Sequence, residues 1–167
     1  MLTKKKSRKY SIAPALILLI FMVFILSQCW ILTKKDADEL EQKVFRLINE
    51  HRVSLGMKEL EWRDVIAEQC RIHSQNMASG TVSFGHSGFN QRCSNIATII
   101  PYSKIEENVA SVVDVMAMSY VAEKAVKEWL KNPSHRIGIE GDFLLTGVGV
   151  AINGPAYYFT QIFVKPH

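Results

Sequence analysis

Two histidines and one glutamate are the residues of this sequence best suited to chemistry. His86 lies in the segment GHSGF, Glu107 in ENVA and His135 in NPSHR. Imidazole and carboxylate groups bind divalent metal ions and transfer protons near neutral pH. We therefore take His86, Glu107 and His135 as candidate catalytic residues and as candidate metal ligands, with Zn²⁺ as the candidate ion.

Sequence spacing alone does not bring these three side chains together. In a plainer interpretation, the two histidines cap backbone groups in loops, and the glutamate ends a helix or binds an amide. If the three do meet, two neutral imidazoles with a carboxylate or water could complete a four-coordinate zinc site. Hydrolysis would further require a general base and a donor for the developing oxyanion.

An uncharged, apolar segment near the N-terminus predicts a transmembrane helix. Residues 11–32 read SIAPALILLIFMVFILSQCWIL, and this length of helix would span about 33 Å. Five basic residues precede it within residues 1–10, so the positive-inside rule places the N-terminus in the cytosol and the body outside. A cleaved signal peptide and a lipoprotein acylated at Cys29 are the alternatives, and all three export the body.

The charge of the exported body argues against a nucleic-acid partner. The chain has 167 residues, of which 48% are hydrophobic, so it can bury a core. Five of its 20 Lys and Arg residues precede the apolar segment, and the other 15 stand against 16 Asp and Glu residues. Phosphate contacts need clustered basic residues, which a nearly neutral body lacks.

Apolar periodicity predicts helices in the body, and a turn signal predicts a C-terminal hairpin. The helices are expected at residues 38–52, 64–79 and 120–131. The hairpin is expected from strands at 147–152 and 157–164 around Asn153-Gly154. Residues 81–108 are expected to be irregular with short helical turns, and residues 111–118 give no clear signal.

The last predicted strand is apolar on both faces, which indicates layers of helices on both sides of a sheet. We therefore predict an α+β fold, a three-layer α-β-α sandwich behind an N-terminal transmembrane helix. The expected organisation is a cytoplasmic tail (1–10), a transmembrane signal anchor (11–32), a linker (33–39) and an extracytoplasmic domain (40–167).

Cys70 and Cys93 are the only cysteines outside the apolar segment. Because disulfides persist in an oxidising exterior, a bridge between these two is the first expectation. The alternative is a zinc site formed by Cys70, His73, His86 and Cys93, since Cys70 and His73 would share one helical face.

Several separated segments together resemble the CAP superfamily, which includes cysteine-rich secretory proteins, venom allergens and plant pathogenesis-related proteins. They are the segments around His86, Glu107 and His135, the preceding Trp129, and the C-terminal LTGVGVA and YYFTQIF. The resemblance covers about residues 40–163 and is to the bacterial type of this SCP domain. It implies an α-β-α sandwich with a cavity on one face, in which the two histidines and the glutamate converge.

This chain departs from the family pattern at two positions. Asn132 stands where many animal relatives have a fourth, acidic member of the set. Ser134 stands where the usual family segment has glycine, and a serine there would be strained if the loop required a positive φ.

The resemblance implies a secreted binding or signalling module rather than an enzyme, and with the apolar segment we expect a membrane-anchored, extracytoplasmic form of it. Its expected ligand is a divalent metal ion or a lipid- or sterol-like molecule. It is expected to contact the membrane through residues 11–32. A weak metal-dependent hydrolase or peptidase using His86, Glu107 and His135 is the first alternative, and a structural or adhesive surface protein is the second.

Overall fold

The computed structural model describes residues 14–114 and 120–167, with the side chains of 14–15 and 24–33 left aside. The chain divides into two compact units, Met1–Lys34 and Lys35–His167. Within the described residues, no helix combines the length and apolar character needed to cross a membrane. The predicted membrane segment 11–32 lies largely outside the side chains that the structure describes.

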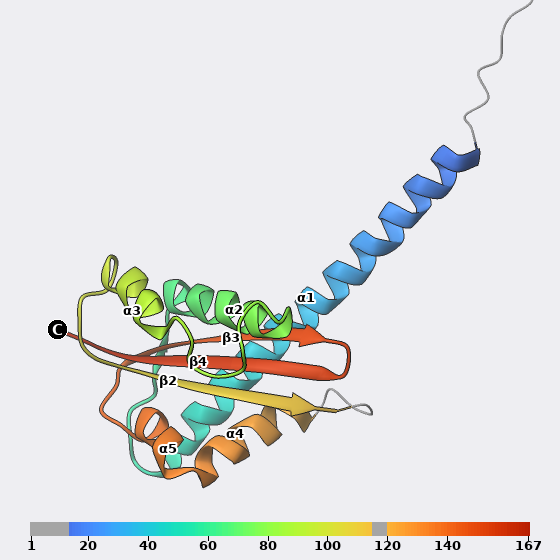
Figure 1. The fold of residues 1–167 in the computed structure, drawn as a ribbon. Coiled ribbons are helices and arrows are strands. Elements are labelled where there is room, and N and C mark those ends of the chain that lie inside the picture. Colours follow the sequence, from blue (N-terminus) through green and yellow to red (C-terminus); the bar gives the residue numbers. More distant parts are fainter. Residues whose placement is uncertain (1–13, 115–119) are drawn as a thin grey trace, which may run out of the picture. The chain divides into compact units, whose positions relative to one another are not determined.

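The second unit is built on a four-stranded sheet with helices on both faces (Figure 1). The elements are α1 (Pro14–Ser54), β1 (Glu61–Trp62), α2 (Asp64–Ala78), α3 (Phe89–Ala97), β2 (Tyr102–Val113), α4 (Val121–Lys131), α5 (Pro133–Ile139), β3 (Leu145–Asn153) and β4 (Ala156–Pro166). The strand order is β1-β3-β4-β2, parallel between β1 and β3 and antiparallel elsewhere. Helices α2 and α3 cover one face, and α4, α5 and the C-terminal part of α1 cover the other. The predicted three-layer sandwich is thereby confirmed.

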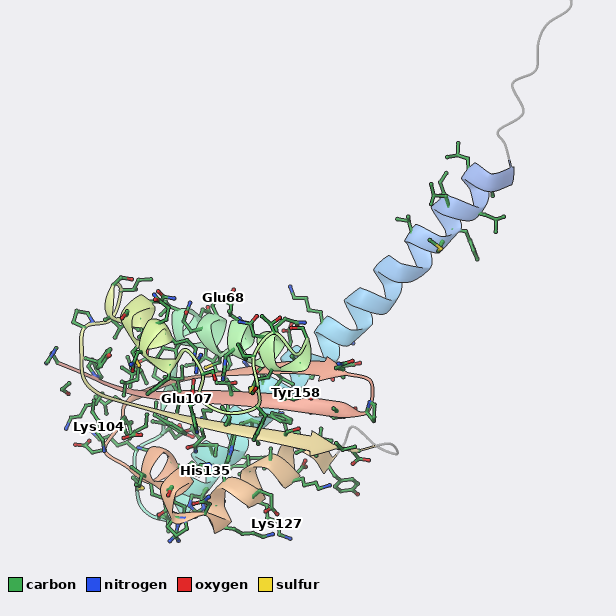
Figure 2. The ribbon with its side chains drawn as sticks, viewed as in Figure 1. Glu68, Lys104, Glu107, Lys127, His135 and Tyr158 are labelled. Carbon is green, nitrogen blue, oxygen red and sulfur yellow. The ribbon has the colours of Figure 1, made fainter. Side chains whose placement is uncertain are left out.

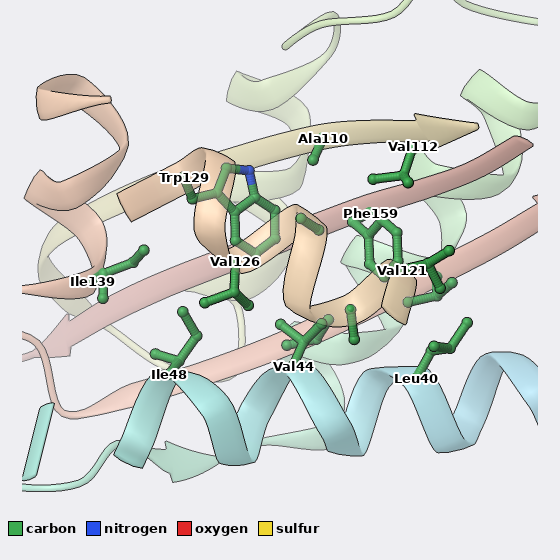
Figure 3. Close-up of a cluster of buried hydrophobic side chains, with 14 of the residues drawn as sticks. Leu40, Val44, Ile48, Ala110, Val112, Val121, Val126, Trp129, Ile139 and Phe159 are labelled. Carbon is green, nitrogen blue, oxygen red and sulfur yellow. The ribbon is translucent and has the colours of Figure 1, made fainter. Parts of the chain in front are cut away.

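The larger core lies between the sheet and the α1 and α4 helices (Figure 3). Leu40, Val44 and Ile48 recur on one face of α1, and all three are buried. From α4, Trp129 packs into the same core and donates a hydrogen bond from its Nε1 to the Val109 carbonyl, 2.9 Å away. The periodicity that predicted these two helices therefore reflects burial against one shared core.

Two glycines of β3 allow α2 to lie directly on the other face of the sheet. A Cβ atom at Gly147 would lie 2.2 Å from the Ala67 nitrogen, and one at Gly149 would lie 2.1 Å from the Arg71 nitrogen. No side chain fits such contacts, so the GVG sequence is a requirement of this helix-on-strand packing.

Side chains of α1 and α2 form hydrogen bonds with backbone groups of β3. The Cys70 thiol donates to the Gly147 carbonyl (3.3 Å), and the Ser74 hydroxyl donates to the Gly149 carbonyl (2.9 Å). The Val150 N–H donates to the buried Glu41 carboxylate (3.1 Å). The Glu41 bond satisfies an N–H on the side of β3 that β1 is too short to cover, whereas the two bonds from α2 go to carbonyls on the side of β3 that faces β4.

Four elements differ from the sequence prediction. The region expected to be irregular contains α3 and most of β2, and β2 also occupies the first residues of the segment without a clear signal. The strand β1 was not predicted, and a separate helix, α5, begins at Pro133, where only the end of the preceding helix was expected. Helices α2 and α4 and the hairpin lie where the sequence predicts them, within a few residues, whereas the helix expected at 38–52 is the C-terminal part of α1, which also runs through the expected linker 33–39.

Candidate functional site

Glu107, one of the predicted site residues, is a buried carboxylate on β2 that is held by an arginine. Its side chain is 1% exposed. Arg92 of α3 donates from Nε to one carboxylate oxygen and from Nη2 to the other, both at 2.7 Å. Arg92 is fixed in turn by a bond from Nη1 to the Ser87 carbonyl (2.8 Å). The charge of Glu107 is thus matched by a nearly buried cation. No local sequence pattern predicts this pair, because Arg92 precedes Glu107 by fifteen residues and lies on another element.

His86 lies next to this ion pair, in the segment between α2 and α3. Its Nδ1 is 2.9 Å from Glu107 Oε1, while the side chain remains 51% exposed. The loop that carries it is anchored by His73, whose Nε2 lies 2.7 Å from the Gly85 carbonyl oxygen. Burial lowers the pKa of His73, which favours its neutral form.

His135 reaches the site from α5, in the opposite layer of the sandwich. Neighbouring residues of a strand point to opposite faces, so Glu107 and Asn108 face different layers. The buried Asn108 amide donates to the His135 carbonyl (2.9 Å), which fixes α5 to β2. Burial, together with the nearby His86, lowers the pKa of His135. Figure 2 labels Glu107 and His135, which come from β2 and α5.

The two departures from the family pattern both lie at the start of α5. The Asn132 side chain accepts a hydrogen bond from the Ser134 N–H (2.9 Å), so it caps the helix. No non-glycine residue of the described chain has a positive φ, and Ser134 is helical. The strain expected for serine at this position therefore does not arise.

The three predicted ligands do not fit a zinc ion as a set. Among the described residues, no three His, Cys, Asp or Glu side chains are grouped as metal ligands would be. Both oxygens of Glu107 accept hydrogen bonds from Arg92, which would have to be displaced. The structure brings His86 and Glu107 into contact and His135 near them, but as a hydrogen-bonded group around an arginine.

The two body cysteines are free and buried, so the predicted disulfide is not formed in this structure. Each sulfur has its own partner: Cys70 bonds to the Gly147 carbonyl, and the Cys93 thiol bonds to the Tyr102 side chain. The alternative zinc site through these cysteines is likewise not formed by the described residues.

A groove between α1 and α4, with a volume of about 480 Å³, was not predicted from the sequence. Leu47, Val126 and Leu130 supply its apolar lining. Lys127 and Lys131 bring positive charge to it, although Lys131 also pairs with Glu128 at 2.6 Å. Glu123 also lines it but forms an ion pair with Lys43 (2.6 Å). The apolar residues of this groove carry the same periodicity as core residues, so sequence alone could not distinguish them.

The fold agrees with the comparison with known families. The profile of the cysteine-rich secretory protein family, CAP, matches residues 45–163. The chain belongs to this family.

Individual relatives include bacterial surface and membrane proteins. The chain is 28% identical over 134 residues to the uncharacterized membrane protein YlbC of Bacillus subtilis, covering 79% of this chain but only 36% of that relative. An extracellular SCP-domain protein of Bacillus anthracis has a TM-score of 0.65 at 23% identity, covering 80% of this chain and 42% of that one. An outer surface protein of Borrelia burgdorferi has a TM-score of 0.63 at 19% identity, covering 77% and 94%. At these identities, the two structures share the fold with this chain.

Proposed function

We propose that this chain is a membrane-anchored, extracytoplasmic binding module that holds an anionic amphiphile in the groove between α1 and α4. The observation that carries this proposal is the groove itself, which combines an apolar lining with Lys127 and Lys131. An alkyl chain would lie against the apolar side chains, and its acidic head group would meet the ammonium groups. Lys127 is labelled on α4 in Figure 2.

Anchoring through residues 11–32 is supported by the side chains described within that segment. The eight residues Leu16 to Val23 are all apolar, and each is at least 49% exposed. Such a continuous apolar surface is typical of a segment that contacts lipid. The match to a protein named as a membrane protein, and the extracellular SCP-domain neighbour, favour an anchored domain outside the cytosol.

An anchor of this kind would confine the body to the membrane surface. Leu40 is already buried in the core of the second unit. Seven residues lie between it and the end of the predicted span, and the eight steps from Leu32 to Leu40 reach about 28 Å at most, even when fully extended. A ligand that resides in the membrane would therefore always be close to the groove.

A hydrolytic role, the alternative from the sequence, lacks a free carboxylate. Among the described residues of the site, the one carboxylate is Glu107, which already accepts two hydrogen bonds from Arg92 and lies against His86. Asn132, at the position of the missing acid, caps α5 instead. His86 alone could take a proton, but hydrolysis would also require a donor for the developing oxyanion, and Arg92 is already bonded to Glu107, so we favour binding over catalysis.

The test compares oleate with oleyl alcohol, an uncharged probe of the same chain length. The full chain is held in amphiphilic polymer, and binding is followed by calorimetry. Replacing Lys127 and Lys131 together by Glu should weaken oleate binding roughly tenfold or more and leave oleyl alcohol binding unchanged. Lys124→Glu is the matched control, since Lys124 belongs to α4 but does not line the groove. Equal oleate affinity in the parent and the double variant would contradict the proposal.

The topology is tested separately with protease added to cells whose outer layers have been opened. Digestion of the body while the cytosol stays intact is expected from the proposed orientation. Digestion only after cell lysis would place the body in the cytosol instead.

A further inference from the structure

The two imidazoles of the candidate site have different hydrogen-bonding partners. His86 Nδ1 faces the carboxylate of Glu107 at 2.9 Å. A carboxylate held by Arg92 only accepts hydrogen bonds, so the neutral His86 ring carries its proton on Nδ1. Its Nε2 then has a free lone pair, and the half-exposed ring can offer that lone pair to a ligand.

His135 has the opposite arrangement. Its Nδ1 is buried and has no hydrogen-bond partner among the described residues. A buried N–H without an acceptor is much rarer in proteins than an acceptor without a donor. The lone pair therefore belongs on Nδ1 and the proton on Nε2. Burial and the nearby His86 lower the pKa of His135, which favours the neutral ring in which this tautomer exists.

We propose that His86 and His135 form an acceptor–donor pair that binds a hydroxyl group rather than chelating a metal ion. A hydroxyl group can donate to His86 Nε2 and accept from His135 Nε2–H at the same time. A chelated metal ion would require a lone pair from both Nε2 atoms. For His135, metal binding through Nε2 would move the proton to the buried Nδ1, which has no hydrogen-bond acceptor among the described residues.

The tautomers are read directly from ¹⁵N shifts of the full chain with labelled histidine, recorded at about pH 8. The chain has five histidines, and the His86→Gln and His135→Gln variants assign the two signals. We expect a protonated Nδ1 in His86 and a protonated Nε2 in His135. A protonated Nδ1 in His135 would overturn the proposal.

Zinc alone provides the second readout. His86→Ala should weaken Zn²⁺ binding roughly 10- to 100-fold, and His135→Ala should change it little, because only His86 offers a lone pair outward. Equal losses in the two variants would show a shared chelate and overturn the proposal.

Two small probes test the ligand class. Glycerol, which donates and accepts, should shift the side-chain signals of both histidines. The diether 1,2-dimethoxyethane only accepts and should shift His135 alone. If glycerol moves neither signal, or if the diether moves both, the assignment of a hydroxyl ligand is wrong. These outcomes are independent of the groove between α1 and α4, which neither histidine lines.

Discussion

Replacing Arg92 by Leu should strongly destabilise the body, because it leaves a buried carboxylate without its cation. Arg92 and Glu107 side chains are 8% and 1% exposed, and two bonds of 2.7 Å join them. Removing one partner of a buried ion pair typically costs about 3–5 kcal/mol of unfolding free energy. For a unit of this size, that corresponds to a fall in Tm of roughly 10–20 °C.

The assay is thermal unfolding of the full chain, followed by circular dichroism. Arg63→Leu is the matched control, since Arg63 pairs with Glu61 at 3.1 Å but both side chains are about half exposed or more; it should change stability by less than about 1 kcal/mol. The double variant Arg92→Leu/Glu107→Leu should recover much of the loss, because no unpaired charge remains. If Arg92→Leu behaves like the exposed control, or if the double variant is less stable than the single one, the reasoning is refuted.

Two further changes test the packing of α2 and the loop it supports. Gly149→Ala would place a methyl group 2.1 Å from the α2 backbone. We expect the unfolding free energy from chemical denaturation to fall by at least about 2 kcal/mol. A fall below about 0.5 kcal/mol, as for an ordinary surface change, would show that α2 moves away freely. Because burial lowers the pKa of His73, the unfolded chain takes up a proton before the folded one as the pH falls. Stability is therefore full above about pH 6.5 and declines below it. Between about pH 7.5 and about pH 5.5, the Tm of His73→Gln should therefore fall less than the Tm of the parent. An equal fall in both would exclude a contribution of His73 to the pH dependence of stability.

Elements with one buried face could be predicted from the sequence, whereas elements placed by tertiary contacts could not. Helix α2 and the hairpin carry regular apolar spacing or a turn signal, and they form where expected. β2 lacks alternation, because the polar Glu107 and Asn108 are buried on opposite faces of the strand. Helix α5 is short, and its start is set by a side-chain cap at Asn132, whose partner is visible only in three dimensions.

The candidate site shows the same division. The sequence supplied His86, Glu107 and His135 by resemblance, and the structure brings the first two into contact and the third near them. What the sequence could not supply was Arg92, which changes the chemistry from metal ligation to a balanced ion pair. Its partner depends on how α3 packs against β2, and no local pattern encodes that contact.

The polar contacts along β3 also determine how copies of this chain can associate. Sheet-to-sheet growth into fibres needs two open edges in every molecule, one to receive a neighbour and one to offer. Here the buried Glu41 already occupies the Val150 N–H, on the edge of β3 that the short β1 strand leaves open, so a strand added at that edge would have to displace a buried carboxylate. Where such molecules are crowded on a cell surface, pairing through their sheets is therefore expected at the β2 edge first.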